Sequence, residues 1–268
     1  MGWEWKEDKN LRFLTIPGWS QMGVITAFST RNDGISDDPY SSLNLAFHVA
    51  DDPVKVLENR KVFLAGLGQP LEKCVAAQQV HGVNVISVSE RDLGRGMSEL
   101  ESAIPECDGM VTQDNIGLMG FFADCVPLYF YHPQINMVGL AHAGWKGTAS
   151  NIVTKIMEKI TAAGGSAKDC FAAIGPCIGS CCYEIGEDVA QIFREKFHNV
   201  IFQTSSGKYR LDLVKANLEL FLKEGILPEN ISIANLCTSC QSELFYSYRR
   251  EGITGRMAAF ITMRKGVI

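Results

Sequence analysis

The chain has 268 residues, of which 46% are hydrophobic and 21% are charged, and its formal net charge is −5. This length and composition are typical of a globular protein with a sizeable buried core. Because the Lys and Arg residues are scattered along an acidic chain, we expect no nucleic-acid partner. The first ten residues are charged where a signal peptide is apolar, and no apolar run is long enough to span a membrane, so we expect a cytoplasmic protein with small-molecule partners.

The first quarter of the chain predicts two strands followed by a helix. Apolar runs at residues 11–16 and 22–29 predict the strands, and a polar loop follows them. Asp51 or Asp52 before Pro53 is typical of a helix start, and we expect this helix to run to about Gly66.

The middle of the chain is rich in predicted strands, and the rest is mainly helical. Short apolar or alternating runs separated by Gly, Asn, Pro or Asp predict strands at residues 75–80, 84–89, 108–112, 117–122, 126–131 and 136–141. Apolar residues at helical spacing then predict helices at residues 148–163, 189–197 and 211–222. Two further strands are expected at residues 231–236 and 257–263.

These elements interleave without the strict alternation of a parallel α/β protein. No internal repeat or linker marks a domain boundary. We therefore expect one domain over residues 1–268 with an α+β fold, in which mixed β-sheets form a sandwich-like core flanked by helices.

Two histidines and one cysteine form the candidate metal site. His81 in QQVHG, Cys125 in ADCVP and His142 in AHAGWKG all lie where strand-like runs meet small-residue turns. Catalytic zinc sites use three such ligands and leave a fourth position open. Antiparallel pairing of the strands beside Cys125 and His142 would bring the two residues together. The alternative is that the histidines are hydrogen-bonded core residues and Cys125 is a small buried hydrophobe.

Asp124, directly before Cys125, is the candidate acid–base residue. Its carboxylate could orient a ligating imidazole, or it could donate or accept a proton on the substrate. The alternative is a packing or turn residue.

Several motifs taken together resemble one known family. QQVHG, ADCVP, AHAGWKG, IGPCIGSCCYEIG and SYRREGITGR, in this order, are similar to the motif set of the laccase-domain (YfiH/YlmD-like) family, and the similarity spans nearly the whole chain. The resemblance implies a fold like that of the catalytic domain of cytotoxic necrotizing factor. It also implies that His81, Cys125 and His142 bind zinc.

The function that this resemblance implies is a purine nucleoside phosphorylase. Such an enzyme would use phosphate to split adenosine, inosine and methylthioadenosine into free base and ribose 1-phosphate or methylthioribose 1-phosphate, with accompanying adenosine deaminase activity. The family's laccase label suggests a copper polyphenol oxidase as an alternative. The chain contains no H-x-H pair of the kind that multicopper oxidases use, so we expect zinc, with copper as an adventitious occupant.

Phosphate requires cationic or backbone donors. The candidates are basic residues in or near these motifs: Arg31, Arg60, Lys146, Arg249 and Arg250. His48 could also face the site. Each of the basic residues is alternatively a solvated surface charge, and His48 is alternatively a half-buried histidine before a helix.

Nine cysteines in a chain of this size favour reduced thiols. Cys237-x-x-Cys240 and the group Cys177, Cys181 and Cys182 suggest a second, structural zinc or a redox pair, although the simpler interpretation is buried or loop thiols.

Two rival functions remain open. Cys125 could be a nucleophile paired with His142 in a metal-free cysteine hydrolase. Alternatively, the chain could be a non-catalytic protein with a structural zinc.

Overall fold

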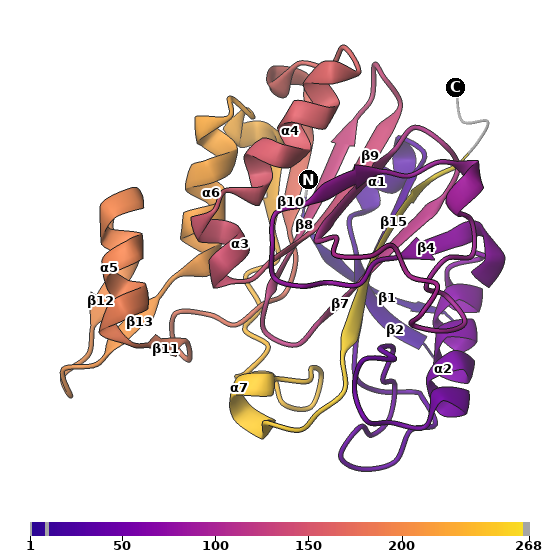
Figure 1. Cartoon of the computed structure of the whole chain (residues 1–268), viewed down its shortest axis with the longest axis horizontal. Coiled ribbons are helices and arrows are strands. Elements are labelled where there is room, and N and C mark those ends of the chain that lie inside the picture. The colour runs from indigo at the N-terminus through magenta and orange to yellow at the C-terminus, as the bar shows by residue number, and fades with distance from the viewer. Residues whose placement is uncertain (1, 9–10, 265–268) are drawn as a thin grey trace.

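The computed structural model describes residues 2–8 and 11–264, and two six-stranded β-sheets form its centre (Figure 1). The first sheet contains, in spatial order, β1 (Glu4–Asp8), β2 (Leu11–Thr15), β3 (Val24–Ser29), β15 (Met257–Met263), β7 (Gly117–Phe122) and β4 (Cys74–Ala76). The second sheet contains β14 (Ile231–Ile233), β10 (Phe171–Ile174), β8 (Val126–His132), β9 (Met137–Ala143), β6 (Gly109–Thr112) and β5 (Val85–Ser87). Between β7 and β8 the chain crosses from the first sheet to the second.

Both sheets are mixed. The pairs β4 with β7, β5 with β6 and β10 with β14 are parallel. The other neighbouring pairs are antiparallel. This arrangement confirms the expected α+β fold with mixed sheets.

The two sheets pack face to face through their apolar side chains. One buried cluster combines Phe28 and Ile261 of the first sheet with Tyr129 and Leu140 of the second. Burial of such large apolar surfaces is the main force that holds the layers together. The core is therefore the sandwich that the sequence predicts.

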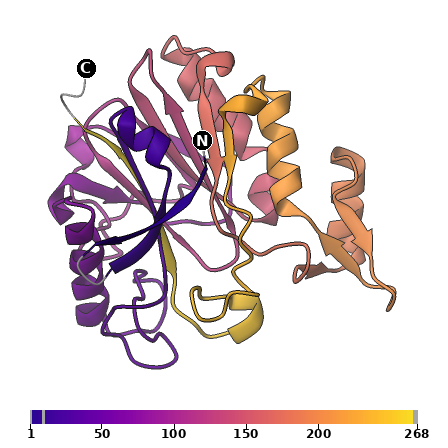
Figure 2. The same cartoon turned by 180° about the vertical axis from the view of Figure 1, so that it is seen from behind.

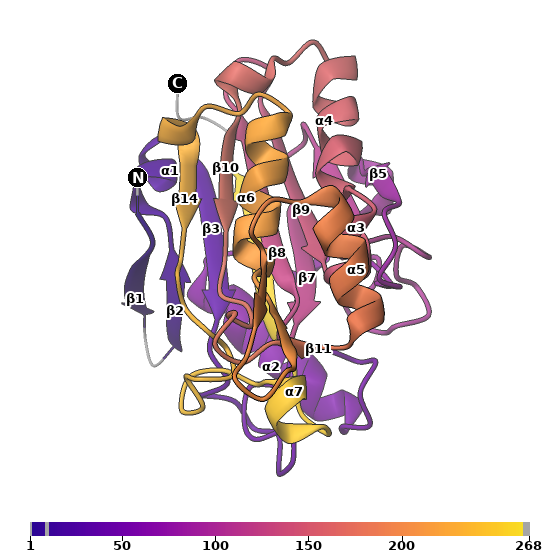
Figure 3. The same cartoon turned by 90° about the vertical axis from the view of Figure 1, so that its left-hand side faces the viewer.

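Helices cover the outer face of each sheet. The helix α2 (Pro53–Gly66) packs on the first sheet through Phe63, which shares a cluster with Phe13 and Phe260. The helices α4 (Ile152–Ala162) and α6 (Leu213–Lys223) cover the second sheet (Figure 3). Figure 2 shows the first sheet from the opposite side, with β1 and β2 nearest the viewer.

The remaining elements lie at the margins of this sandwich. A three-stranded sheet of β11 (Glu184–Ile185), β13 (Tyr209–Leu211) and β12 (Ile201–Gln203) lies beside α5 (Glu187–Lys196), to the left in Figure 1. The short helices are α1 (Pro17–Gln21), α3 (Trp145–Ala149) and α7 (Tyr248–Glu251). No helix in residues 2–8 and 11–264 has the length and apolar character needed to cross a membrane.

The predicted helix over residues 148–163 is wrong in its first turn. The chain forms α3, breaks at Asn151 and begins again as α4. Asn151 has a φ of 58°, in the left-handed region, and its side chain accepts a hydrogen bond from the backbone N of Thr154. Ile152, Ile156 and Ile160 are buried in α4, as their spacing predicts.

The sequence explains why the start of α2 was predicted and why β1 was missed. The start of α2 is confirmed, because the side chain of Asp52 accepts a hydrogen bond from the backbone N of Val54 and Pro53 occupies the first turn. Strand β1 was not predicted, because its sequence EWKED is largely charged and its charged side chains face solvent at the sheet edge.

Candidate metal centre

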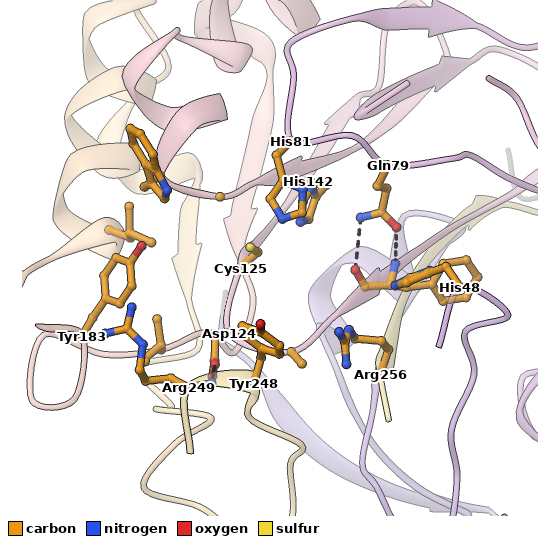
Figure 4. Close-up of a pocket in the computed structure, with 16 residues that line it drawn as sticks. His48, Gln79, His81, Asp124, Cys125, His142, Tyr183, Tyr248, Arg249 and Arg256 are labelled. Carbon is orange, nitrogen blue, oxygen red and sulfur yellow. Dashed lines mark hydrogen bonds between the residues drawn. The ribbon is translucent and has the colours of Figure 1, made fainter. Parts of the chain in front are cut away.

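Three separate elements bring His81, Cys125 and His142 together. His81 follows β4, Cys125 lies in the crossing between the sheets, and His142 lies in β9. Pro127 of β8 is paired with His142, so the predicted strand pairing places Cys125 beside this histidine. The ligand atoms of the three side chains lie within 4.8 Å of one another, and Figure 4 shows them pointing toward one another.

Asp108, directly before β6, holds two of these residues. Its Oδ1 accepts hydrogen bonds from Nδ1 of His142 at 2.8 Å and from the backbone N of His81 at 2.9 Å. Because Nδ1 of His142 is engaged, Nε2 is the atom available to a metal ion. His81 has a φ of 60°, and the bond to Asp108 supports this costly left-handed conformation.

The electrostatics of the cluster favour a charged pair. Burial raises the pKa of Cys125, but the charges and hydrogen bonds of His142 and His81 outweigh it and lower this pKa to about 6. Burial lowers the pKa of His142, but Cys125 and Asp108 outweigh it and raise this pKa to about 9. At neutral pH the thiolate form is therefore favoured, and a metal ion must displace a proton from His142.

The surroundings of the cluster fit a metal ion. A side chain on Gly144 would place its Cβ 3.1 Å from Sγ of Cys125 and 3.2 Å from Cδ2 of His81, so any larger residue here would press on two of the three side chains. His142 is 5% exposed, whereas His81 is open to solvent. Two imidazoles and a thiolate could therefore hold one ion with a free coordination position toward the outside.

A cleft of about 540 Å³ opens onto this cluster. This volume falls within the range of small-molecule sites. Besides the three candidate ligands, aromatic and basic residues line the cleft: His48, Phe121, Trp145, Tyr183, Tyr248, Arg249 and Arg256. Its chemistry suits a ligand with a flat ring and an anionic group.

Asp124 lines the cleft, but it does not hold a ligating imidazole. Its Oδ1 accepts from Oγ1 of Thr238 at 2.7 Å, and its Oδ2 accepts from the backbone N of Arg249 at 2.7 Å. Asp124 also has a φ of 94°, in the left-handed region. The carboxylate that orients His142 is Asp108, so the expectation that Asp124 orients a ligating imidazole is corrected.

Arg249 and His48 are brought to the cleft as expected. The guanidinium of Arg249 donates to the backbone O of Glu184 and lies 4.9 Å from the ring centre of Tyr183. Desolvation of the imidazole ring by the surrounding protein, together with the positive charge of Arg256, lowers the pKa of His48 to about 4. His48 is therefore neutral at neutral pH.

Arg60 and Arg31 do not line the cleft. Arg60 is 1% exposed, and its guanidinium donates to the backbone O atoms of Leu45, Gly96 and Met97. Arg31 forms an ion pair with Glu251 at 2.7 Å. Both guanidinium groups are engaged inside the protein, so the expected contact with a bound phosphate is corrected for both.

Lys146 and Arg250 also lie outside the lining of the cleft. Lys146 is exposed on α3. Arg250 donates to the backbone O atoms of Thr238 and Ser239 at 2.9 and 2.8 Å. Arg250 therefore holds a loop and is not free for a ligand.

Sequence reasoning missed several residues of the site. Asp108 and Arg256 each stand directly before a strand, but nothing in the local pattern shows that they face the ligands. Gln79 was also missed: its side chain exchanges two hydrogen bonds with the backbone of Phe121, at 3.1 and 2.8 Å (Figure 4). The only available signal was position, since Gln79 lies in the QQVHG motif and Arg256 ends the SYRREGITGR motif.

Comparisons with known proteins show the family of the chain. Residues 25–264 match a family described as multi-copper polyphenol oxidoreductase laccase. The purine nucleoside phosphorylase YlmD of Geobacillus stearothermophilus is 39% identical over 255 residues, covering 91% of each chain. The protein of the same name from Bacillus subtilis is 38% identical over 263 residues, covering 94% of this chain and 95% of that protein.

Solved structures show the same relationship. The crystal structure of YlmD from Geobacillus stearothermophilus superimposes with a TM-score of 0.92 at 37% identity, covering 97% of this chain and 99% of that chain. The hypothetical protein YfiH of Bacillus licheniformis gives the same values. From its sequence, its fold and these relatives, the chain belongs to the laccase-domain family of YfiH and YlmD proteins.

Proposed function

We propose that the chain is a zinc-dependent purine nucleoside phosphorylase acting on adenosine, inosine and methylthioadenosine. The observation that carries this proposal is the cluster of His81, Cys125 and His142, which faces a cleft with aromatic and cationic walls. The names of the similar YlmD proteins support the same activity.

Zinc suits a site of imidazole and thiolate ligands with an open position. When bound, it supplies a Lewis acid that polarises a coordinated atom of the substrate. Copper would also bind such ligands tightly, so copper found in a preparation would not identify the native metal. A multicopper oxidase needs many histidines, and this chain has five, of which two are in the cluster.

Arg249 and Arg256 are the proposed phosphate-binding residues, because both line the cleft. In phosphorolysis a phosphate oxygen forms a bond to C1′ of the ribose while the bond from C1′ to the purine nitrogen breaks. The electron pair of that bond leaves with the purine, which then takes up a proton. Two guanidinium groups would position the phosphate and offset its charge.

The aromatic residues of the cleft are the proposed binding surface for the purine. Tyr183 and Tyr248 offer flat faces for stacking. His48 is neutral at neutral pH, so it can donate or accept one hydrogen bond to the nucleoside. Asp124 remains the proposed acid–base residue, since its carboxylate borders the cleft beside Cys125.

We also propose that adenosine deamination occurs in the same cleft. In that reaction water adds to C6 of adenine and ammonia leaves. It requires the metal ligands and the purine surface but no bound phosphate. The arginines should therefore affect the two reactions differently.

The direct test is to incubate purified protein with adenosine, with and without phosphate, and to follow adenine, inosine and hypoxanthine. The proposal requires that base release depends on phosphate and yields ribose 1-phosphate. Base release at the same rate without phosphate would identify a hydrolase and contradict it.

One observation favours a second candidate function. Cys125, His142 and Asp108 are arranged as a nucleophile, a base and an orienting carboxylate, with a thiol whose pKa is lowered to about 6. His81 has no role in such a triad, which favours the metal site. Alkylation distinguishes the two, because a zinc-bound Cys125 should react only after a chelator is added, whereas a free nucleophile should react at once.

A further inference from the structure

A second group of metal-binding side chains lies apart from the His81 site. Cys181 and Cys182 lie between β10 and β11, and Cys237 and Cys240 follow β14. Their four Sγ atoms lie within 4.8 Å of one another. The four thiols therefore come from two segments far apart in the sequence.

The spacing of the sulfur atoms suits a single tetrahedral ion. Sγ of Cys240 lies 3.5 Å from Sγ of Cys181 and 3.4 Å from Sγ of Cys182. Four thiolates around zinc, at a bond length of about 2.3 Å, would be separated by about 3.8 Å. A disulfide requires a separation of about 2.05 Å and joins only two of the sulfur atoms.

The backbone holds the two segments in register. Cys177 forms a parallel bridge with Cys237, and the backbone N of Thr238 donates to the backbone O of Cys177 at 3.0 Å. The backbone N of Gly179 donates to Sγ of Cys237 at 3.2 Å. A hydrogen bond of this kind stabilises a thiolate, which is the form that binds a metal. Cys177 itself is 1% exposed and is not part of the group.

Two arginines donate hydrogen bonds to the backbone of the loop that carries Cys237 and Cys240. Arg250 donates to the backbone O atoms of Thr238 and Ser239, inside the Cys-x-x-Cys segment. Arg31 donates to the backbone O of Ser242 at 3.3 Å. Both arginines form ion pairs with one carboxylate, Glu251. The guanidinium of Arg250, which contacts the segment between Cys237 and Cys240, would offset part of the negative charge of four thiolates around one divalent ion.

We propose that Cys181, Cys182, Cys237 and Cys240 form a second metal site that binds structural zinc. Four protein ligands close the coordination sphere, so this site takes no substrate. Binding releases the protons of the thiols that are still protonated. The proposal goes beyond the phosphorylase activity and does not depend on it.

The second site would support the wall of the cleft. Ile178 and Tyr183, which flank the first pair of cysteines, line the cleft. Thr238, within the second pair, donates to Asp124, which also lines it. A metal joining the two segments would therefore fix two walls of the cleft relative to each other.

Zinc content provides the first test. Protein purified under reducing conditions is compared with the double variant Cys181→Ser/Cys240→Ser and with Ser180→Ala, a change in the same loop that removes no thiol. The double variant should lose about one zinc per chain relative to the wild type, while Ser180→Ala should lose none. Equal zinc content in the double variant and the wild type would overturn the proposal.

Two further measurements leave the four cysteines unchanged, so they hold even if the double cysteine variant does not fold. Alkylation followed by peptide mapping should find all four cysteines protected until a chelator is added. X-ray absorption of a His81→Ala/His142→Ala variant loaded with zinc should show only sulfur neighbours, at about 2.3 Å. Peptides joined by a disulfide in protein kept under reducing conditions, or free alkylation before chelation, would overturn the second site and leave the His81 site unaffected.

Discussion

Asp108 connects the candidate metal centre to the neighbouring strands through its side chain and its backbone. Its carboxylate binds the ring of His142 and the backbone of His81, while its backbone O accepts from the backbone N of His142 at 2.7 Å. It also accepts from the backbone N of Gly82 at 2.7 Å. One buried carboxylate thus sets the position of two of the three candidate ligands.

We predict that Asp108→Asn weakens zinc binding at this site by about 10- to 100-fold, because the variant keeps the shape of the side chain but loses the charge that orients His142. Competition with a chromogenic chelator measures the affinity. Asp114→Asn, a carboxylate beyond the other end of β6, is the matched control and should bind zinc normally. Normal affinity in Asp108→Asn would show that this charge does not support the ligands.

The affinity for zinc should rise with pH. Between about pH 6 and pH 9 the thiol of Cys125 is already deprotonated while His142 is protonated, so binding displaces one proton. Affinity should therefore rise about tenfold per pH unit in this window and more steeply below it, where Cys125 also loses a proton. Calorimetric titration at several pH values measures the slope. An affinity that does not change with pH would contradict the charged pair.

Arg249→Ala should raise the phosphate concentration needed for base release and should spare deamination, because only phosphorolysis binds phosphate. Initial rates at varied phosphate, with adenosine as substrate, give both values. Lys146→Ala, in an exposed basic residue outside the cleft lining, is the control. If the phosphate requirement stays at the wild-type value in both variants, Arg249 does not bind phosphate.

At the residue scale the motifs singled out three residues that the structure brings together, but they did not reveal the residue that holds two of them. Imidazole and thiolate groups are recognisable because few residue types bind zinc. Asp108 was missed because its contact with His142 spans 34 residues and exists only when β6 pairs with β9. Arg60 was expected to bind phosphate because the sequence shows its positive charge but not the three backbone carbonyls that satisfy that charge inside the protein.

Among the elements, the break between α3 and α4 keeps α3 next to the candidate metal centre. Gly147 is buried within α3, where a Cβ would lie 3.2 Å from the backbone O of Gly82 and 3.4 Å from that of His142. A continuous helix would carry the chain away in a straight line. The turn at Asn151 instead lets α3 remain close to His81 and His142 while α4 packs on the second sheet.

Asn151→Ala should lower the free energy of unfolding by about 1–3 kcal/mol, because it removes the cap of α4 and places alanine at a left-handed φ. Asn151→Gly loses the same cap without the backbone cost, so its loss should be smaller. Guanidinium denaturation of both variants measures the difference. Equal stability of the two variants would show that the left-handed conformation costs nothing here.

Element prediction succeeded where a strand or helix has an apolar pattern of its own. The buried strands β7, β8 and β9 and the capped helix α2 are examples. It failed for the charged strand β1 and for β12, two of whose three residues are exposed. Both depend on a neighbouring strand for their hydrogen bonds, and that neighbour is not visible in the local sequence.

In the whole molecule, the candidate metal centre lies where the two sheets meet. His81 follows a strand of the first sheet, His142 lies in the second, and Cys125 lies in the crossing between them. The mixed sandwich could be predicted from the interleaving of strands and helices. The cleft could not, because its wall combines Tyr183 of a marginal segment with Tyr248 and Arg256 near the end of the chain.

The most direct test of the proposed function compares zinc-loaded wild type with His142→Ala in an assay that measures both adenine and ribose 1-phosphate released from adenosine. The wild type should form the two products in equal amounts and only with phosphate present. His142→Ala, which lacks one of three metal ligands, should lose this reaction together with deamination. Phosphate-dependent turnover at the wild-type rate in His142→Ala, or adenine release by the wild type without ribose 1-phosphate, would contradict a phosphorylase built on this metal centre.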